Sequence, residues 1–145
     1  MKIEYRFDYH CTPEQFFRSL TSAEAISGWW TDRCEMQSVQ AGAAHFQWIP
    51  HDWRVSVEIK KLIPGEYVEW FCTESNMQNT DAWKGSTISF RIAPGVDGGT
   101  TLQFLHDGYK NSPCFDECTA GWAFVLGKSL KGYLEAGQGA PFQNQ

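Results

Sequence analysis

Clustered positive charge and long apolar runs are both missing from this sequence of 145 residues. It has 12 lysine and arginine residues against 17 aspartate and glutamate residues, which gives a formal net charge of -5 at pH 7. Proteins that bind nucleic acid or anionic membranes use clustered positive charge, so the sequence predicts neither partner. No apolar stretch is long enough for a membrane span, and no basic segment followed by an apolar one opens the chain. We therefore expect a cytoplasmic protein without a signal peptide.

A disulfide framework is lacking too, because the five cysteines are odd in number and irregularly spaced. We expect reduced thiols at Cys11, Cys34, Cys72, Cys114 and Cys118. Cys114 and Cys118 share a helix face, a spacing that suits a metal site or a redox pair. Without a second pair or a nearby histidine, however, two such cysteines are typical of small buried side chains, so we predict no metal. A redox role for Cys114 at a helix start stays open.

Motifs for the common catalytic chemistries are absent as well. The sequence has no glycine-rich phosphate loop, no nucleophile elbow and no zinc-binding His-Glu-x-x-His helix. No aspartate or glutamate falls on an inward position in the middle of a predicted strand, so paired carboxylates for acid and base catalysis are missing. The sequence therefore disfavours phosphoryl and acyl transfer, and it predicts no cofactor.

Strand patterns, by contrast, are abundant. Apolar and polar residues alternate with a period of two, which predicts strands at residues 2–10, 44–48, 53–60, 68–73, 88–92 and 102–107. The connections are short, with turn signals at Pro64-Gly65 and Asp97-Gly98-Gly99, so successive strands should be antiparallel neighbours. One face of such a sheet packs against a core and the other faces water.

Two helix signals follow the first strand. Thr12-Pro13-Glu14-Gln15 combines a capping threonine, a proline at the first helical position and a glutamine two residues later, which predicts a short helix. The capping pattern returns at Thr21-Ser22-Ala23-Glu24 and predicts a second short helix that ends near Gly28.

The longest helix signal lies near the C-terminus. An apolar stripe of helical period runs from Phe115 to Tyr133, after a helix start at Ser112-Pro113 and before a stop at Gly137. This order of elements predicts an α+β fold with one domain over residues 1–145. We expect a curved antiparallel sheet of six to seven strands wrapped around the long C-terminal helix, with two short helices after the first strand.

Three stretches resemble sequences of a known family. They are SLTSAEAISGWWT (residues 19–31), the region from Trp83-Gly85 to GGTTLQFLHDGY (residues 98–109), and GWAFVLGKSLKGYLEAGQGAP (residues 121–141). They are similar to segments of heat-shock ATPase activator homologues, which are grouped with polyketide cyclases and dehydrases in the START-like (SRPBCC) superfamily. The resemblance implies the helix-grip fold over residues 1–145. It also implies an apolar small molecule held between sheet and helix, an expectation that rests on the likeness alone.

Seven tryptophans are present, and most fall on inward positions of the predicted strands and of the long helix. We predict a ligand-binding site between sheet and helix, formed by Trp30, Trp48, Trp70, Phe90, Phe104, His106, Trp122, Leu126 and Tyr133. A curved sheet around one helix encloses more volume than side chains fill easily, so we expect a cavity of about 300 to 1,000 Å³. The alternative is that these rings pack into a solid core.

His106 is the only histidine whose strand phase places it inward. A buried histidine can be neutral and bonded to a backbone carbonyl or to Tyr133. It can also move a proton, and Tyr5, Tyr9 and Tyr133 are then candidate hydrogen-bonding partners. Because the strand ends at Asp107-Gly108, we expect His106 near the mouth of the cavity and in contact with a ligand.

These features favour the binding of a small apolar or aromatic molecule, with no catalysis or only weak catalysis. The first alternative is an enzyme of the cyclase or dehydrase type that uses His106 as acid and base. The second is a chaperone-interacting module, which the name of the resembling family implies. Phe124 and Leu105 lie on otherwise polar faces and mark a candidate homodimer patch.

Overall fold

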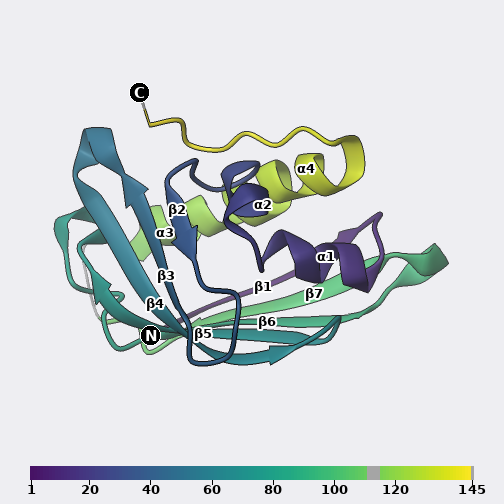
Figure 1. The fold of residues 1–145 in the computed structure, drawn as a ribbon, viewed down its shortest axis with the longest axis horizontal. Coiled ribbons are helices and arrows are strands. Elements are labelled where there is room, and N and C mark those ends of the chain that lie inside the picture. The colour runs from purple at the N-terminus through teal and green to yellow at the C-terminus, as the bar shows by residue number, and fades with distance from the viewer. Residues whose placement is uncertain (111–114, 145) are drawn as a thin grey trace.

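The computed structural model describes residues 1–110 and 115–144, and its largest element is one antiparallel sheet (Figure 1). The strands are β1 (Lys2–Tyr9), β2 (Cys34–Met36), β3 (Ala43–Trp48), β4 (Trp53–Ile63), β5 (Tyr67–Ser75), β6 (Thr87–Pro94) and β7 (Thr100–Asp107). They pair in the order β1-β7-β6-β5-β4-β3-β2. The α-helices are α1 (Pro13–Ser19), α2 (Ala23–Ser27), α3 (Phe115–Phe124) and α4 (Leu130–Ala136). The short 3-10 turns are η1 (Ile49–His51), η2 (Met77–Asn79) and η3 (Val96–Gly98), and η4 (Val125–Ser129) is a π-helical segment between α3 and α4.

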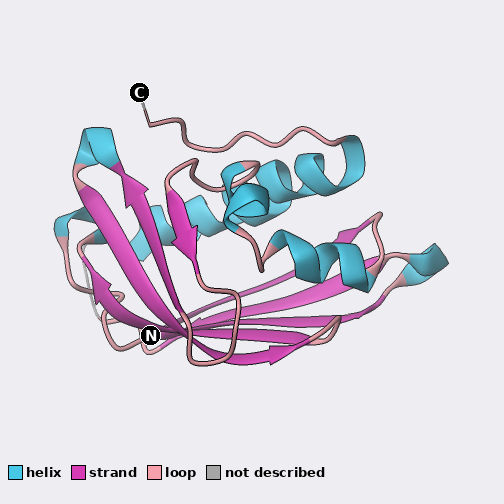
Figure 2. Ribbon diagram, in the orientation of Figure 1, coloured by secondary structure: helices cyan, strands magenta, loops and turns pink. Residues whose placement is uncertain are grey.

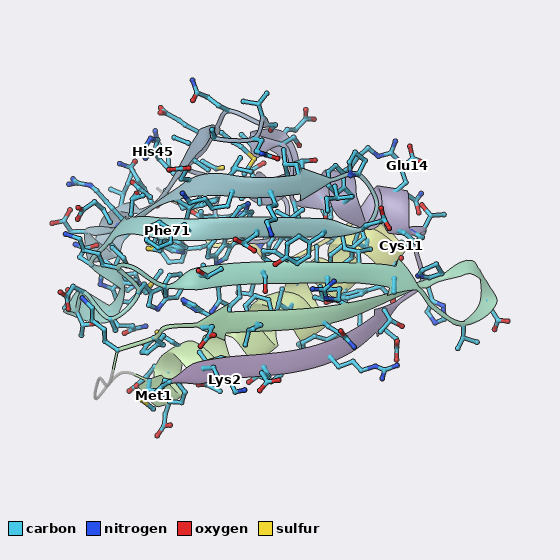
Figure 3. The ribbon with its side chains drawn as sticks, turned by 90° about the horizontal axis from the view of Figure 1, so that it is seen from below. Met1, Lys2, Cys11, Glu14, His45 and Phe71 are labelled. Carbon is cyan, nitrogen blue, oxygen red and sulfur yellow. The ribbon has the colours of Figure 1, made fainter. Side chains whose placement is uncertain are left out.

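The helices all lie on one side of the sheet. Figure 2 shows the sheet bent into a trough, with α3 and α4 lying across its concave side and α1 and α2 over the same side. Figure 3 views the sheet from its outer side, with the helices behind it. The predicted α+β helix-grip fold is therefore confirmed.

Alternation along the strands sets the face that each side chain occupies. In β4, Val55, Val57 and Ile59 are buried, and in β7 the buried positions include Phe104 and His106. These match the predicted inward phases. The short strand β2 was not predicted, because three residues paired at the edge of a sheet are too few to display a period of two.

The curvature of the sheet has a local cause in its longest strand. The register between β4 and β5 shifts at Ser56/Val57 and again at Ile59/Lys61. An extra residue in one strand of an antiparallel pair bends that strand and increases its twist. These two irregularities help to curl the sheet around the helix.

The predicted helix ends are confirmed wherever the structure describes them. Thr12 forms the capping box with Gln15, and the Ser22 hydroxyl accepts from the amide of Ala25. Gly137 ends α4 with a φ of 75°, the left-handed region that favours glycine. The predicted helix start at Ser112-Pro113 lies outside the described residues.

The long helix changes its hydrogen-bond pattern where it meets β1. The Tyr9 hydroxyl donates to the carbonyl oxygen of Leu126 at 2.8 Å, inside the π-helical segment η4. A Cβ on Gly127 would lie 2.9 Å from the Phe7 ring, so glycine permits this close approach. The Ser129 hydroxyl donates to the Trp29 carbonyl at 2.6 Å and ties the helix to the segment after α2. None of the described helices has the length and apolar character needed to cross a membrane.

Candidate functional site

The space between sheet and helix is occupied by a cluster of indole and phenyl rings centred on Trp30. The Trp30 ring lies nearly parallel to those of Trp29, with centroids 6.0 Å apart and an angle of 10°, and of Trp70, at 6.2 Å and 9°. The edges and tilted faces of three further rings contact it, with centroids at 4.6 Å for Phe46, 5.3 Å for Trp48 and 5.3 Å for Trp122. Because five aromatic rings surround Trp30, this residue is packed in place and only 6% exposed.

Trp122 links this cluster to a second stack. Its ring is stacked on Trp83 at 5.6 Å and packs against Phe104 at 4.6 Å. Phe104 contacts Phe90, and Phe90 contacts Trp70, which closes the circuit of rings beneath the helix. The interior is thus packed with aromatic side chains, as the alternative reading of the sequence expected.

One pocket remains at the edge of this cluster, with a volume of about 140 Å³. Its lining residues are Trp30, Trp48, Met77, Gln78, Trp83, Glu117, Cys118, Gly121, Trp122 and Val125. They come from the loop after α2, from β3, η2, the turn before β6, α3 and η4, and the exposed Glu117 and Gly121 mark its opening to the surface. The pocket is smaller than the predicted cavity because the stacked rings fill most of the interior.

The predicted site residues divide into two groups. Trp30, Trp48 and Trp122 line the pocket. Behind them, buried and outside the pocket lining, lie Trp70, Phe90, Phe104, His106 and Leu126.

Tyr133 lies away from this cluster. Its ring occupies the space beside Gly28, and it borders a surface hollow with residues of α1 and α2. The structure gives no support to its place in the site.

The pocket also has walls that the sequence did not reveal. Trp83 sits in a turn at residues 82–85, where no strand or helix phase assigns its direction. Met77 and Gln78 belong to the 3-10 turn η2, in a segment that the polar composition marked as a loop. The one available signal was Trp83 itself, a large apolar residue in a polar loop.

His106 is fully buried and both of its ring nitrogens are engaged. Trp122 Nε1 donates to His106 Nδ1 at 3.2 Å, and because an indole N–H can only donate, Nδ1 is the unprotonated nitrogen. Nε2 therefore carries the hydrogen and donates to Ser86 Oγ at 2.8 Å. Burial lowers the pKa of His106 to about 3, so the ring is neutral at neutral pH.

The role of His106 follows from these contacts. It accepts the hydrogen bond of the Trp122 indole on the side away from the pocket, and its ring contacts that of Trp83 edge-on, with centroids 4.8 Å apart. The predicted tyrosine partners are not found, since the Tyr5 hydroxyl donates to the Thr119 carbonyl and the Tyr9 hydroxyl to that of Leu126. The expectation that His106 contacts a ligand at the mouth is also corrected, because it lies behind the pocket wall. His106 positions two pocket walls.

The cysteines that the structure describes form no disulfide with one another. Burial raises the pKa of Cys34 and of Cys72 to about 12, so both thiols stay protonated. Cys118 is buried on the pocket wall. Cys114 lies outside the described residues, so its pairing with Cys118 stays a hypothesis. Within residues 1–110 and 115–144, no three histidine, cysteine, aspartate or glutamate side chains are grouped closely enough to hold a metal ion.

Residues 10–135 match the family described as "Activator of Hsp90 ATPase homolog 1-like protein". Among solved structures, the Aha1 dimer from Colwellia psychrerythraea is 26% identical, with a TM-score of 0.82 over 96% of this chain and 99% of that one. CalU16 from Micromonospora echinospora is 17% identical, with a TM-score of 0.68 over 87% of this chain and 71% of that one. DynU16, a putative protein in the dynemicin biosynthetic locus, is 13% identical, with a TM-score of 0.72 over 95% of this chain and 48% of that one. No curated protein matches the chain.

The low pKa of His106 predicts a pH dependence of stability. Its pKa is about 3 in the folded protein and 6.5 in the unfolded chain, so below pH 6.5 the unfolded chain takes up a proton that the folded protein does not. This histidine therefore contributes stability that is complete above pH 6.5 and is lost as the pH falls toward 3. At pH 5 the loss is about 2 kcal/mol.

Urea unfolding of the wild type and of His106→Gln at pH 7, 6 and 5 measures this effect. The change with pH should be steeper in the wild type by about 2 kcal/mol at pH 5, and at pH 7 the variant should be less stable by about 1 to 3 kcal/mol. The exposed His10, His45 and His51 are common to both proteins and cancel in the comparison. Parallel pH profiles would show that His106 titrates normally and is not held neutral by burial.

Proposed function

We propose that this chain, which belongs to the family of Activator of Hsp90 ATPase homolog 1-like proteins, binds one small apolar or aromatic molecule. In the START-like fold of this family, a curved sheet encloses a helix. The observation that carries this proposal is the pocket of about 140 Å³, four of whose walls are the indoles of Trp30, Trp48, Trp83 and Trp122. A mostly apolar concave site with few polar groups is the usual form of a small-molecule site.

The size of the pocket limits the ligand. An engineered apolar cavity of about 150 Å³ binds benzene, so 140 Å³ suits a single ring or a similar group. The rings around it are held by stacking and by the Trp122–His106 hydrogen bond, so the pocket is preformed. A preformed site binds without the cost of ordering its walls.

The likeness to CalU16 and DynU16 adds only the fold, because both are under 25% identical to this chain. The proposal therefore depends on the pocket and not on the setting of those proteins.

A cyclase or dehydrase reaction finds no support in the geometry. His106 is separated from the pocket by the Trp122 wall, and its low pKa makes it a weak base. The described residues that line the pocket include no histidine, and Glu117 is the one carboxylate among them. General acid and base catalysis would need a second group within hydrogen-bonding reach of the ligand.

A chaperone-binding role is not favoured by any described surface. The large apolar side chains that are exposed include Val39, Ile49, Ile63, Val96 and Phe124. They come from separate elements and loops, so no single described helix or strand presents an exposed apolar strip of the kind that docks a partner.

Substitution of Gly121 tests the pocket directly. Gly121 lines the pocket, and within the described part of the chain nothing beyond its own helix turn lies within 4 Å of the position of an added Cβ. Gly121→Leu should therefore fill the opening without disturbing the core, and it should weaken toluene binding by about tenfold or more, a loss of about 1.4 kcal/mol. Toluene titrations followed by tryptophan emission measure the affinity.

The matched control is Ala120→Leu, which adds the same side chain at the neighbouring exposed position of α3, outside the pocket lining. This variant should bind toluene as the wild type does. If the wild type shows no change in emission or melting temperature up to the solubility limit of toluene, the binding proposal is wrong.

A second proposal is that the chain forms a homodimer through α3. It is supported by the relative from Colwellia psychrerythraea, which is described as a dimer. Phe124 on α3 is 48% exposed, an unusual environment for a phenyl ring. Leu105 does not extend this patch, because its side chain lies on the outer face of β7 while α3 lies over the inner face. The patch predicted from both residues is therefore reduced to Phe124.

Sedimentation equilibrium at micromolar concentrations tests this dimer. The wild type should sediment as a dimer, and Phe124→Ser should shift it toward monomer by removing apolar area from the interface. Val96→Ser, at the 82% exposed Val96 of the β6–β7 turn, should remain dimeric. A monomeric wild type would refute the dimer, and a dimeric Phe124→Ser would refute the assignment to α3.

A further inference from the structure

One wall of the pocket is different in kind from the others. Of the described residues that line it, six are buried: Trp30, Trp48, Met77, Trp83, Cys118 and Trp122. Each of the four indoles packs against at least one other ring of this set, and the cysteine side chain is short. Met77 alone among the six has a long, unbranched side chain, the kind that fills an irregular gap beside rigid groups.

The side chain of Met77 lies on the inner side of η2. Met77 is 8% exposed and belongs to the buried apolar core, whereas its neighbours Asn76 and Asn79 are exposed. Because Met77 is part of both the core and the pocket lining, the space that its side chain fills adjoins the pocket.

The backbone that carries Met77 is held by its own segment. The Met77 amide donates to Ser75 Oγ at 3.1 Å, and the Met77 carbonyl accepts from the Thr80 amide at 3.3 Å. The next two residues, Gln78 and Asn79, have φ angles of 56° and 61°. Non-glycine residues keep this left-handed conformation where the surrounding contacts fix them.

Two asparagine side chains supply such contacts by tying η2 to the sheet. Asn76 accepts from the Arg54 amide at 2.6 Å and donates to the Asp52 carbonyl at 2.8 Å. Asn79 accepts from Trp53 Nε1 at 3.3 Å. All three partners lie at the start of β4 or directly before it. The wall that Met77 forms therefore cannot retreat by moving its backbone without breaking these bonds.

We infer that Met77 sets the upper size of the ligand, so that the pocket accepts a single aromatic ring and excludes two fused rings. This inference rests on the proposed small-molecule function and specifies its ligand class by size. Beyond Cβ, the Met77 side chain consists of Cγ, Sδ and Cε, and naphthalene has three more carbon atoms than toluene. The fused ring therefore needs about the space that the Met77 side chain fills.

The variant Met77→Ala tests the assignment, because it removes those three atoms and leaves the ring packing in place. In the wild type, naphthalene should bind at least about tenfold more weakly than toluene. In Met77→Ala, naphthalene binding should strengthen about tenfold or more. Toluene binding should not strengthen, because one ring leaves the added space empty and gains no contacts from it. Calorimetric titrations measure both affinities.

Met36→Ala is the matched control. Met36 lies on β2, is half-buried against the core, and does not line the pocket. Removal of the same three atoms there should leave the ratio of the two affinities as it is in the wild type. An equal gain in naphthalene binding by Met36→Ala would refute the inference, because loosening of the core at any point would then admit the larger ligand.

A methyl spectrum gives a second readout that does not depend on the stability of Met77→Ala. With ¹³C in the methionine methyl groups, toluene should shift the Met77 signal through its ring current and leave the Met36 signal unchanged. Met77→Leu identifies the Met77 signal by its loss. This exchange keeps most of the volume, so the variant should fold and still exclude naphthalene.

The outcomes separate this inference from the proposed function. If neither toluene nor naphthalene binds the wild type or Met77→Ala, the proposed function itself fails. If toluene binds but does not shift the Met77 methyl signal, or if naphthalene binds the wild type as tightly as toluene does, the pocket stands and the role of Met77 is refuted.

Discussion

The packing of Trp30 against Trp29, Trp70 and three further rings sets the shape of the interior on which the proposed site depends. A ring that contacts five others has little room to turn, and aromatic pairs of this kind add about 0.5 to 1.5 kcal/mol each beyond the burial of their area. Because Trp30 is fixed in the middle of the trough, the volume that a curved sheet leaves under its helix is already occupied. What remains open is the edge of the cluster, where Trp30 meets Trp48 and Trp122.

The buried hydrogen bond between Trp122 and His106 supports the wall that the long helix gives to the pocket. His106 accepts from Trp122 and donates to Ser86, so it joins the long helix to the start of β6. The sequence suggested a proton-transferring group here, yet burial keeps this ring neutral and its two hydrogen bonds use both nitrogens. The same residue that looked catalytic is better explained as the support that orients the Trp122 and Trp83 rings.

Local patterns predicted the fold well, because alternation and capping act over a few residues. They could not predict η4, which arises where the Tyr9 hydroxyl meets the Leu126 carbonyl, a contact between distant parts of the chain. Strand phase also placed Phe90 and His106 on the correct face but could not tell which inward rings border a void. Tyr133 shared the helix stripe of Trp122, yet at 1.5 Å per residue it lies about 16 Å further along the axis.

A crystal structure of the protein with toluene bound tests the central claim most directly, namely that a packed indole cluster leaves a single-ring site only at its edge. We expect density for one ring beside Trp83 and Gly121, two residues that line the pocket. The stack of Trp29, Trp30 and Trp70 should be unchanged. Density between the sheet and Leu126, with Trp30 displaced from its stack, would contradict it, because the interior would then open to admit the ligand.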